Sequence, residues 1–266
     1  MSRKAYPSDL NDTEWKLIEP LLPAESGIGH PREVDFREII NAIFYVQREG
    51  GTWRGLPGDF PPWQTVYNYL RHWQRLGVWQ QMHDQLREQV RQMVGKEVEA
   101  SAAMLDSQSV KNDGKKGEVY GYDAGKKVKG RKRFALVDTL GLLITVVVLE
   151  ASCPERVGGA AAVLEAAKEA TQGLQVIWVD QGFSGANFAR VVQQLTAAEV
   201  EVICRQSDGF EVLPKRWIVE RTFAWWNYYR RLSKDYEMLV EMSEAMIYGA
   251  MIHLMVRRLG KAQTQT

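Results

Sequence analysis

The sequence predicts a mixed α/β sheet with helices on its faces, preceded by an all-helical region. Two observations predict this fold class. Up to residue 97, apolar residues recur at helical spacing. After residue 100, short apolar runs alternate with turn signals and with Ala-rich helical segments. A chain of 266 residues can hold two modest domains, and we place them at residues 1–97 and 98–266.

Apolar residues at spacings of three and four predict four helices in residues 1–97. Candidate N-caps precede the first helix, Pro20 and Pro23 end it, and Gly50-Gly51 stops the second. The N-cap candidates of the first helix lie between Asp9 and Trp15, and the other three helices are expected to start close to Phe36, Trp63 and Val78.

The third of these helices carries polar side chains beside aromatic ones. A short helix of this kind is typical of the recognition helix in a helix-turn-helix motif. The alternative is an amphipathic helix of a bundle whose polar residues face solvent, and the pattern alone favours this alternative. The residues that would read DNA are Gln64, Thr65, Asn68 and Arg71.

Beyond Ser101 the pattern predicts five strands and three helices in the order βββαβαβα. A hairpin turn at 138–141 joins the second and third strands. The strands are expected at 102–105, 133–137, 142–149, 174–179 and 200–204, and the helices at 157–170, 186–198 and 214–232.

Three acidic residues fall where such a fold would bring them together. Asp106 and Asp180 each end an apolar run, and Glu220 lies on the last of the expected helices. Sites in open α/β sheets form at the carboxyl ends of strands. Converging carboxylates repel each other unless a cation lies between them, and Mg²⁺ or Mn²⁺ suits oxygen ligands. Each acid alone has an ordinary explanation, as a turn cap or as the ion-pair partner of Arg216, but together they favour a two-metal phosphoryl-transfer site.

The segment Lys111–Arg133, here called the basic segment, is locally cationic. It holds nine Lys or Arg against three Asp or Glu, whereas the whole chain has a net charge of only +1. A loop of this composition can lie along a phosphate backbone and release counterions. A solvated linker is the alternative, but the position directly after Asp106 favours contact with DNA.

Other features exclude several classes of protein. Cys153 and Cys204 make neither a disulfide framework nor a zinc site. The N-terminus lacks the apolar core of a signal peptide. Glu241 and Glu244 interrupt the most apolar segment, which we therefore expect to be a packed helix. We expect a soluble, cytoplasmic protein.

Several motifs carry a resemblance that spans nearly the whole chain. The N-terminal pieces are Leu10–Trp15, Arg48–Pro57 and Trp63–Tyr67; the later ones are Asp106–Lys111, Lys129–Arg133, Val137–Gly141, Val219–Trp225 and Arg230–Glu237. In these motifs the chain resembles the DDE transposases of bacterial insertion sequences, specifically the IS5 group of IS4/IS5-type elements.

The resemblance implies an RNase H-like catalytic domain in which Asp106, Asp180 and Glu220 hold two Mg²⁺ ions, with Mn²⁺ as a substitute. It implies binding to double-stranded DNA, namely the terminal inverted repeats of the element and the target. It further implies a homodimer or larger assembly on DNA, in a bacterial cytoplasm at the nucleoid. The residues expected to hold DNA in this domain are Lys111, Lys129, Arg131, Lys132, Arg133, Arg216, Arg221, Asn227 and Arg231.

The chain departs from the related insertion-sequence pattern around the glutamate. It keeps Arg216 and Glu220 but has Leu213 where a Tyr would fall and Asn227 where a Lys would fall. The segment 153–159 also departs from the Asp-containing turn expected there. Three other functions stay open: a nuclease of the same fold that cuts without joining, a DNA-binding regulator with weak catalysis, and an α/β domain of unrelated use.

Overall fold

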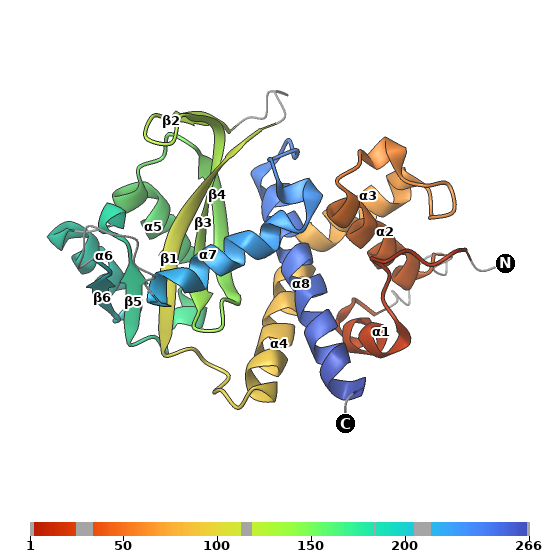
Figure 1. Cartoon of the computed structure of the whole chain (residues 1–266), viewed down its shortest axis with the longest axis horizontal. Helices are drawn as coiled ribbons and strands as arrows, with labels where there is room; N and C mark the ends of the chain where they lie inside the picture. Colours follow the sequence, from red (N-terminus) through yellow and green to blue (C-terminus); the bar gives the residue numbers. More distant parts are fainter. Residues whose placement is uncertain (1–2, 25–33, 113–118, 184, 205–213, 265–266) are drawn as a thin grey trace.

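The computed structural model describes residues 3–24, 34–112, 119–183, 185–204 and 214–264. A curved sheet lies between two layers of helices, and the N-terminal helices form a further body beside it (Figure 1). The strands are β1 (Ala102–Lys111), β2 (Gly121–Asp123), β3 (Val128–Asp138), β4 (Leu143–Glu150), β5 (Val176–Val179) and β6 (Glu199–Val202).

The sheet is mixed, as predicted. β3 pairs antiparallel with β1, β2 and β4, whereas β1, β5 and β6 are parallel neighbours. In the described residues it has six strands and not the five expected, because β2 forms within the basic segment. Gly130 lets β3 pass close to β1, since a Cβ atom there would lie 2.1 Å from the carbonyl oxygen of Val110.

Alternation along the strands gives the sheet two apolar faces. On one face Leu105 and Phe134 belong to a core shared with α5 (Ala160–Ala166) and α6 (Ala186–Thr196). On the other face Met104 and Val137 pack in a second core with α7 (Pro214–Asn227) and α8 (Val240–Thr264). In Figure 1, α7 crosses in front of β1, and α8 runs between the sheet and the N-terminal helices.

The N-terminal helices begin and end where the sequence signals predict. A capping box between Asn11 and Glu14 starts the first of them. Gly50 ends the second in the left-handed conformation, with φ of 76°, which glycine adopts without steric cost. The four helices are α1 (Asp12–Ile18), α2 (Phe36–Glu49), α3 (Trp63–Arg75) and α4 (Val78–Met93).

The two predicted domains share one hydrophobic core. α8 packs along α4 and also contacts α1, α2 and α3. Apolar residues of these helices, of α8 and of one sheet face form a continuous buried cluster. The division into two domains at residue 97 stays a prediction. In the structure, the residues on both sides of this boundary contribute to the same hydrophobic core. Within the described ranges, no helix is long and apolar enough to cross a membrane.

Two of the expected helices are shorter than predicted. α5 covers only 160–166, and a π-helical turn at Glu155–Gly159 precedes it. α7 ends at Asn227 and not at 232, because Tyr229 is extended. Arg231 then turns inward to the carboxylate of Glu237 and the carbonyl oxygen of Gly51.

A buried histidine gives this core a pH dependence. His253 of α8 stacks on Phe44 of α2 with ring centroids 4.4 Å apart. Burial lowers the pKa of His253 to about 3, and the positive charges of Arg257 and Arg48 add to the effect. A lowered folded-state pKa favours the neutral ring, so stability is full above the unfolded pKa and is lost as the pH falls below it.

We expect His253→Gln to be less sensitive to acid than the wild type. With an unfolded-state pKa of about 6.5, the His253 ring costs the wild type about 2 kcal/mol between pH 8 and pH 5. Urea unfolding at both pH values measures this difference. His72→Gln, at an exposed position, is the control. An equal loss of stability in the His253 variant and the wild type would contradict the assignment.

Candidate active site

Asp106 and Asp180 are brought together by the register of two parallel strands. Leu105 of β1 is opposite Val179 of β5, and each acid is the next residue of its chain. Asp106 does not end its strand as predicted, because β1 continues to Lys111 by pairing with β3. β5 does end, so the two carboxylates lie where the parallel pairing stops.

The raised pKa of Asp106 is consistent with its closeness to Asp180. The pKa of Asp106 is raised to about 7, chiefly because desolvation disfavours the charged form and also because of the charge of Asp180. The N–H of Ser107 and the cations Lys126 and Arg216 act in the opposite direction. Asp106 is therefore a half-buried carboxyl group with too little positive charge around it to ionise as an ordinary aspartate does.

Glu220 reaches the same region from α7. The Nε atom of Arg216, one helical turn earlier, lies 3.1 Å from Oε1 of Glu220. The same guanidinium group has Nη2 4.0 Å from Oδ2 of Asp180. Arg216 thus links the helix acid to the strand acid.

The carboxylate groups of these residues are suitable ligands for a divalent cation, but their present positions do not form a metal site. Among the residues that the structure describes, no three His, Cys, Asp or Glu side chains lie close enough to hold a metal. Arg216 occupies the space between Asp180 and Glu220. The half-buried carboxyl of Asp106 beside Asp180 nevertheless offers oxygen donors whose ionisation a dication would favour.

A fourth carboxylate lies next to these acids. Glu155 accepts a hydrogen bond of 2.7 Å from the hydroxyl of Ser107. A Cβ atom added to Gly182 would lie 2.9 Å from Oδ1 of Asp180 and 3.0 Å from Oε2 of Glu155, so the two carboxylates line one narrow space. In the sequence, Glu155 follows the third expected strand and lies in the divergent segment 153–159.

Lys126 is a site residue that the sequence did not single out. Its ammonium group lies 3.5 Å from Oε1 of Glu155 and donates a 3.2 Å hydrogen bond to the carbonyl oxygen of Ser107. The charge of the basic segment was the available signal. Only the fold of the β2–β3 hairpin decides which of its lysines reaches the acids.

Three basic residues of β3 do not fit the phosphate-binding role predicted for them. Arg131 is buried and pairs with Asp235. Arg133 is buried and donates to the carbonyl oxygen of Leu232. Lys132 is buried within 4 Å of both Asp123 and Glu155. The basic composition of residues 111–133 predicted a solvent-facing loop. These three side chains instead belong to β3 and bind to partners in the interior of the protein.

Two arginines near α7 also have internal partners. Arg221 donates to the carbonyl oxygen of Leu140 and lies over the ring of Trp225. Arg231 is buried and pairs with Glu237. Their first role is to hold α7 and the segment after it. Arg231 lies outside α7, although the expected helix at 214–232 included it.

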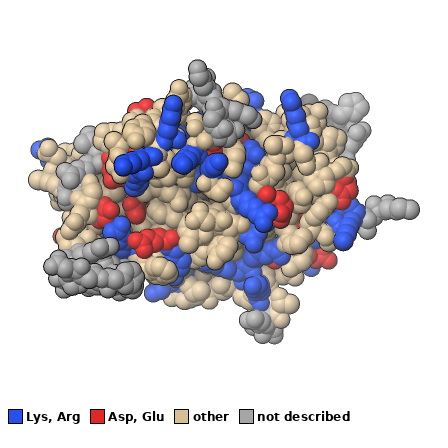
Figure 2. Space-filling model, turned by 45° about the horizontal axis from the view of Figure 1, so that its top comes forward, with Lys and Arg blue, Asp and Glu red and all other residues tan. Residues whose placement is uncertain are grey.

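The remaining residues predicted to bind DNA are accessible. Lys111, Lys129 and Asn227 are exposed, as are Gln64 and Asn68 on α3; Thr65 and Arg71 are half-buried. Figure 2 shows Lys and Arg side chains on both the sheet half and the helical half of one face. Leu213 lies outside the described residues.

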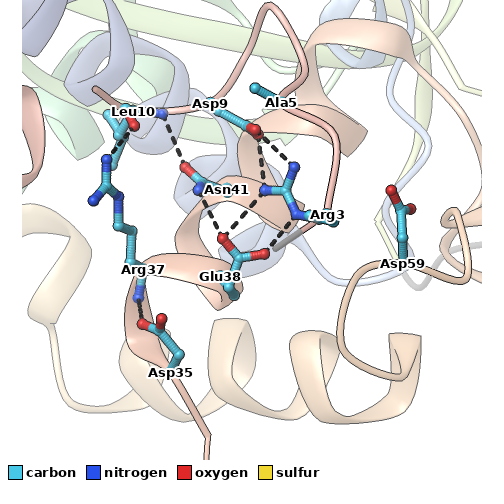
Figure 3. A pocket seen from close by; sticks show the side chains of 9 residues that line it. All are labelled: Arg3, Ala5, Asp9, Leu10, Asp35, Arg37, Glu38, Asn41 and Asp59. Atoms are coloured by element: carbon cyan, nitrogen blue, oxygen red, sulfur yellow. Dashed lines mark hydrogen bonds and ion pairs between the residues drawn. The ribbon is translucent and has the colours of Figure 1, made fainter. Parts of the chain in front are cut away.

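A polar cavity of about 500 Å³ lies among the N-terminal helices, away from the acids. Its lining carries both signs of charge, and Arg3 lies between Asp9 and Glu38 (Figure 3). These partners anchor the N-terminal arm on α2. The cavity is therefore explained by the packing of the helical region.

Comparison with known proteins agrees with this architecture. Residues 99–255, which include all three acids, match the family described as "Transposase DDE domain". The chain belongs to the DDE-domain transposase family. Residues 10–83 match a second family, "Putative transposase of IS4/5 family". The RNase H-like fold and the resemblance to IS4/IS5-type transposases are thereby confirmed.

A curated relative supports the same family. The "Insertion element IS402 uncharacterized 16.2 kDa protein" of Burkholderia cepacia is 33% identical over 109 residues. The match covers 38% of this chain and 72% of that protein. Family membership makes this chain a transposase by its domain. It does not assign roles to single residues.

Proposed function

We propose that this chain binds the terminal inverted repeats of its insertion sequence, hydrolyses a phosphodiester bond at each end and joins the 3′-OH to target DNA. The observation that carries this proposal is the juxtaposition of Asp106 and Asp180 at the end of the β1–β5 pairing. Glu220 faces them across Arg216.

Asp106, Asp180 and Glu220 would hold two Mg²⁺ ions, which when bound activate the attacking oxygen and stabilise the leaving one. The protein's own residues position the DNA. The exposed Lys111, Lys129 and Asn227 would contact phosphate and sugar along the DNA. Arg216 holds Glu220 until the substrate phosphate competes for its guanidinium group. Pairing of two DNA ends calls for a dimer or larger assembly, at the bacterial nucleoid.

An assay with labelled DNA tests the proposal. Wild-type protein, Mg²⁺ and a duplex carrying the element's own end should give a cut at the terminus, and an added target duplex should give joined products. Cutting without joined products would favour a nuclease of the same fold. Specific binding without cutting, in Mg²⁺ and in Mn²⁺, would favour the regulator. A chain with no salt-dependent affinity for DNA would contradict all three.

The exposed residues of α3 are proposed to read the terminal repeat. We expect the double variant Gln64→Ala/Asn68→Ala to lose about 10- to 100-fold in affinity for the repeat while binding to unrelated DNA changes little. Competition binding with both duplexes measures the ratio. Gln80→Ala/Gln81→Ala, at exposed positions of α4, is the control. A uniform loss on both duplexes would assign α3 to backbone contact alone.

A further inference from the structure

We propose that Lys126 is a substrate-binding residue of the active site that contacts the phosphate beside the cut. The proposal rests on the proposed function, since it names a residue of that same site. It is carried by the placement of Lys126 between the acids and solvent.

The hairpin that carries Lys126 is built to hold its position. Asp123 accepts a 3.0 Å hydrogen bond from the backbone N–H of Lys126 and a 2.6 Å bond from the hydroxyl of Ser109. Lys132 approaches the same carboxylate at 3.4 Å. These bonds lower the pKa of Asp123 to about 2 against the opposing effect of burial, so the carboxylate stays charged. The turn is therefore fastened to β1 and β3.

From this turn, Lys126 reaches the edge of β1 next to Asp106. Its ammonium group meets the carbonyl oxygen of Ser107, the residue after Asp106. Glu155 lies 3.5 Å away, a distance longer than a direct hydrogen bond. An ammonium group has three donors, and these two partners leave capacity for another acceptor.

Accessibility separates Lys126 from the other cations near the acids. The side chain of Lys126 is 47% exposed, whereas that of Lys132 is only 7% exposed. Arg216 is held by Glu220. Lys126 also lines an open cavity of about 380 Å³ together with Tyr122, Lys132 and Glu155.

The charge balance of the site explains why a phosphate needs this lysine. Without bound metal, Asp106, Asp180 and Glu155 present carboxyl groups at one edge, and a phosphodiester approaching them is repelled. Lys126 approaches from the hairpin side of Asp106, and Arg216 approaches from α7, so the two cations flank that acid.

Two asparagine substitutions in one turn test the assignment. Lys126→Asn and Lys127→Asn remove the same charge from neighbouring positions, and asparagine tolerates the φ of 53° at residue 127. We expect Lys126→Asn to slow cleavage roughly 100-fold, the scale of losing one charge-stabilising donor in an active site. Lys127→Asn should stay within about threefold, and Lys126→Arg should recover most of the rate.

Neutral methylphosphonate links, placed one at a time around the terminus, locate the contact. In binding measured without divalent metal, one such link should weaken the wild type and Lys127→Asn about tenfold but should leave Lys126→Asn unchanged. Equal cleavage by the two asparagine variants, or equal sensitivity of both to every link, would overturn the proposal. A wild type that binds but never cuts would instead refute the proposed function, and the binding arm would still decide the Lys126 contact.

Discussion

Replacing Asp180 with asparagine is expected to reduce DNA cleavage by at least about 1000-fold while the protein still folds and binds DNA. The carboxylate is half of the Asp106–Asp180 pair on which the proposed metal site depends. Asparagine keeps an oxygen that can accept the 2.8 Å hydrogen bond from the N–H of Gly182, so the local turn survives. What it removes is the negative charge that would hold a dication.

Single-turnover cleavage of a terminal-repeat duplex measures this loss, with binding followed separately by anisotropy. Glu199→Gln, at an exposed position of the neighbouring strand β6, neutralises an acid outside the site and should cleave like the wild type. Cleavage by Asp180→Asn within tenfold of the wild-type rate would show that the reaction does not use this pair of acids.

The largest effect on stability is expected at Asp138. This residue is fully buried, accepts hydrogen bonds of 2.9 Å from the N–H groups of Leu140 and Leu142, and pairs with the buried Arg91 of α4. Asp138→Ala would leave Arg91 charged and unpaired in the interior. Breaking a buried pair in this way costs about 3–5 kcal/mol.

Urea unfolding measures the change in free energy, and the surface offers a matched control. Asp12 pairs with Arg37 at 2.7 Å, but its side chain is 85% exposed. Asp12→Ala makes the same substitution opposite the same kind of partner and should cost no more than about 1 kcal/mol. Similar losses in the two variants would mean that burial does not set the strength of the Asp138 pair.

The helical region could be predicted from sequence because its signals are local. Asn11, Gly50 and the apolar spacing act within a turn or two of the chain. The strands were underestimated because β1 and β3 carry polar residues that the apolar pattern excludes. Arg131 is acceptable inside β3 only because Asp235, far along the chain, lies beside it.

The candidate site could likewise be predicted only in part from the sequence. The order of elements and the family motifs placed Asp106, Asp180 and Glu220 in one region. Lys126 and Glu155 could not be placed, because their approach depends on the bend of the β2–β3 hairpin and on the π-helical turn before α5. These are properties of three-dimensional packing, and residue type alone does not encode them.

The position of α8 near the end of the chain has a consequence for folding during synthesis. The amino-terminal helices bury their apolar faces against Met246, Ile252 and Leu259, residues that the ribosome adds after the whole sheet has been made. Domains commonly fold during synthesis in order from the N-terminus. Here the first helices complete their core only when the last one is present, so a prematurely terminated polypeptide would carry an unfinished form of the region that we propose reads DNA.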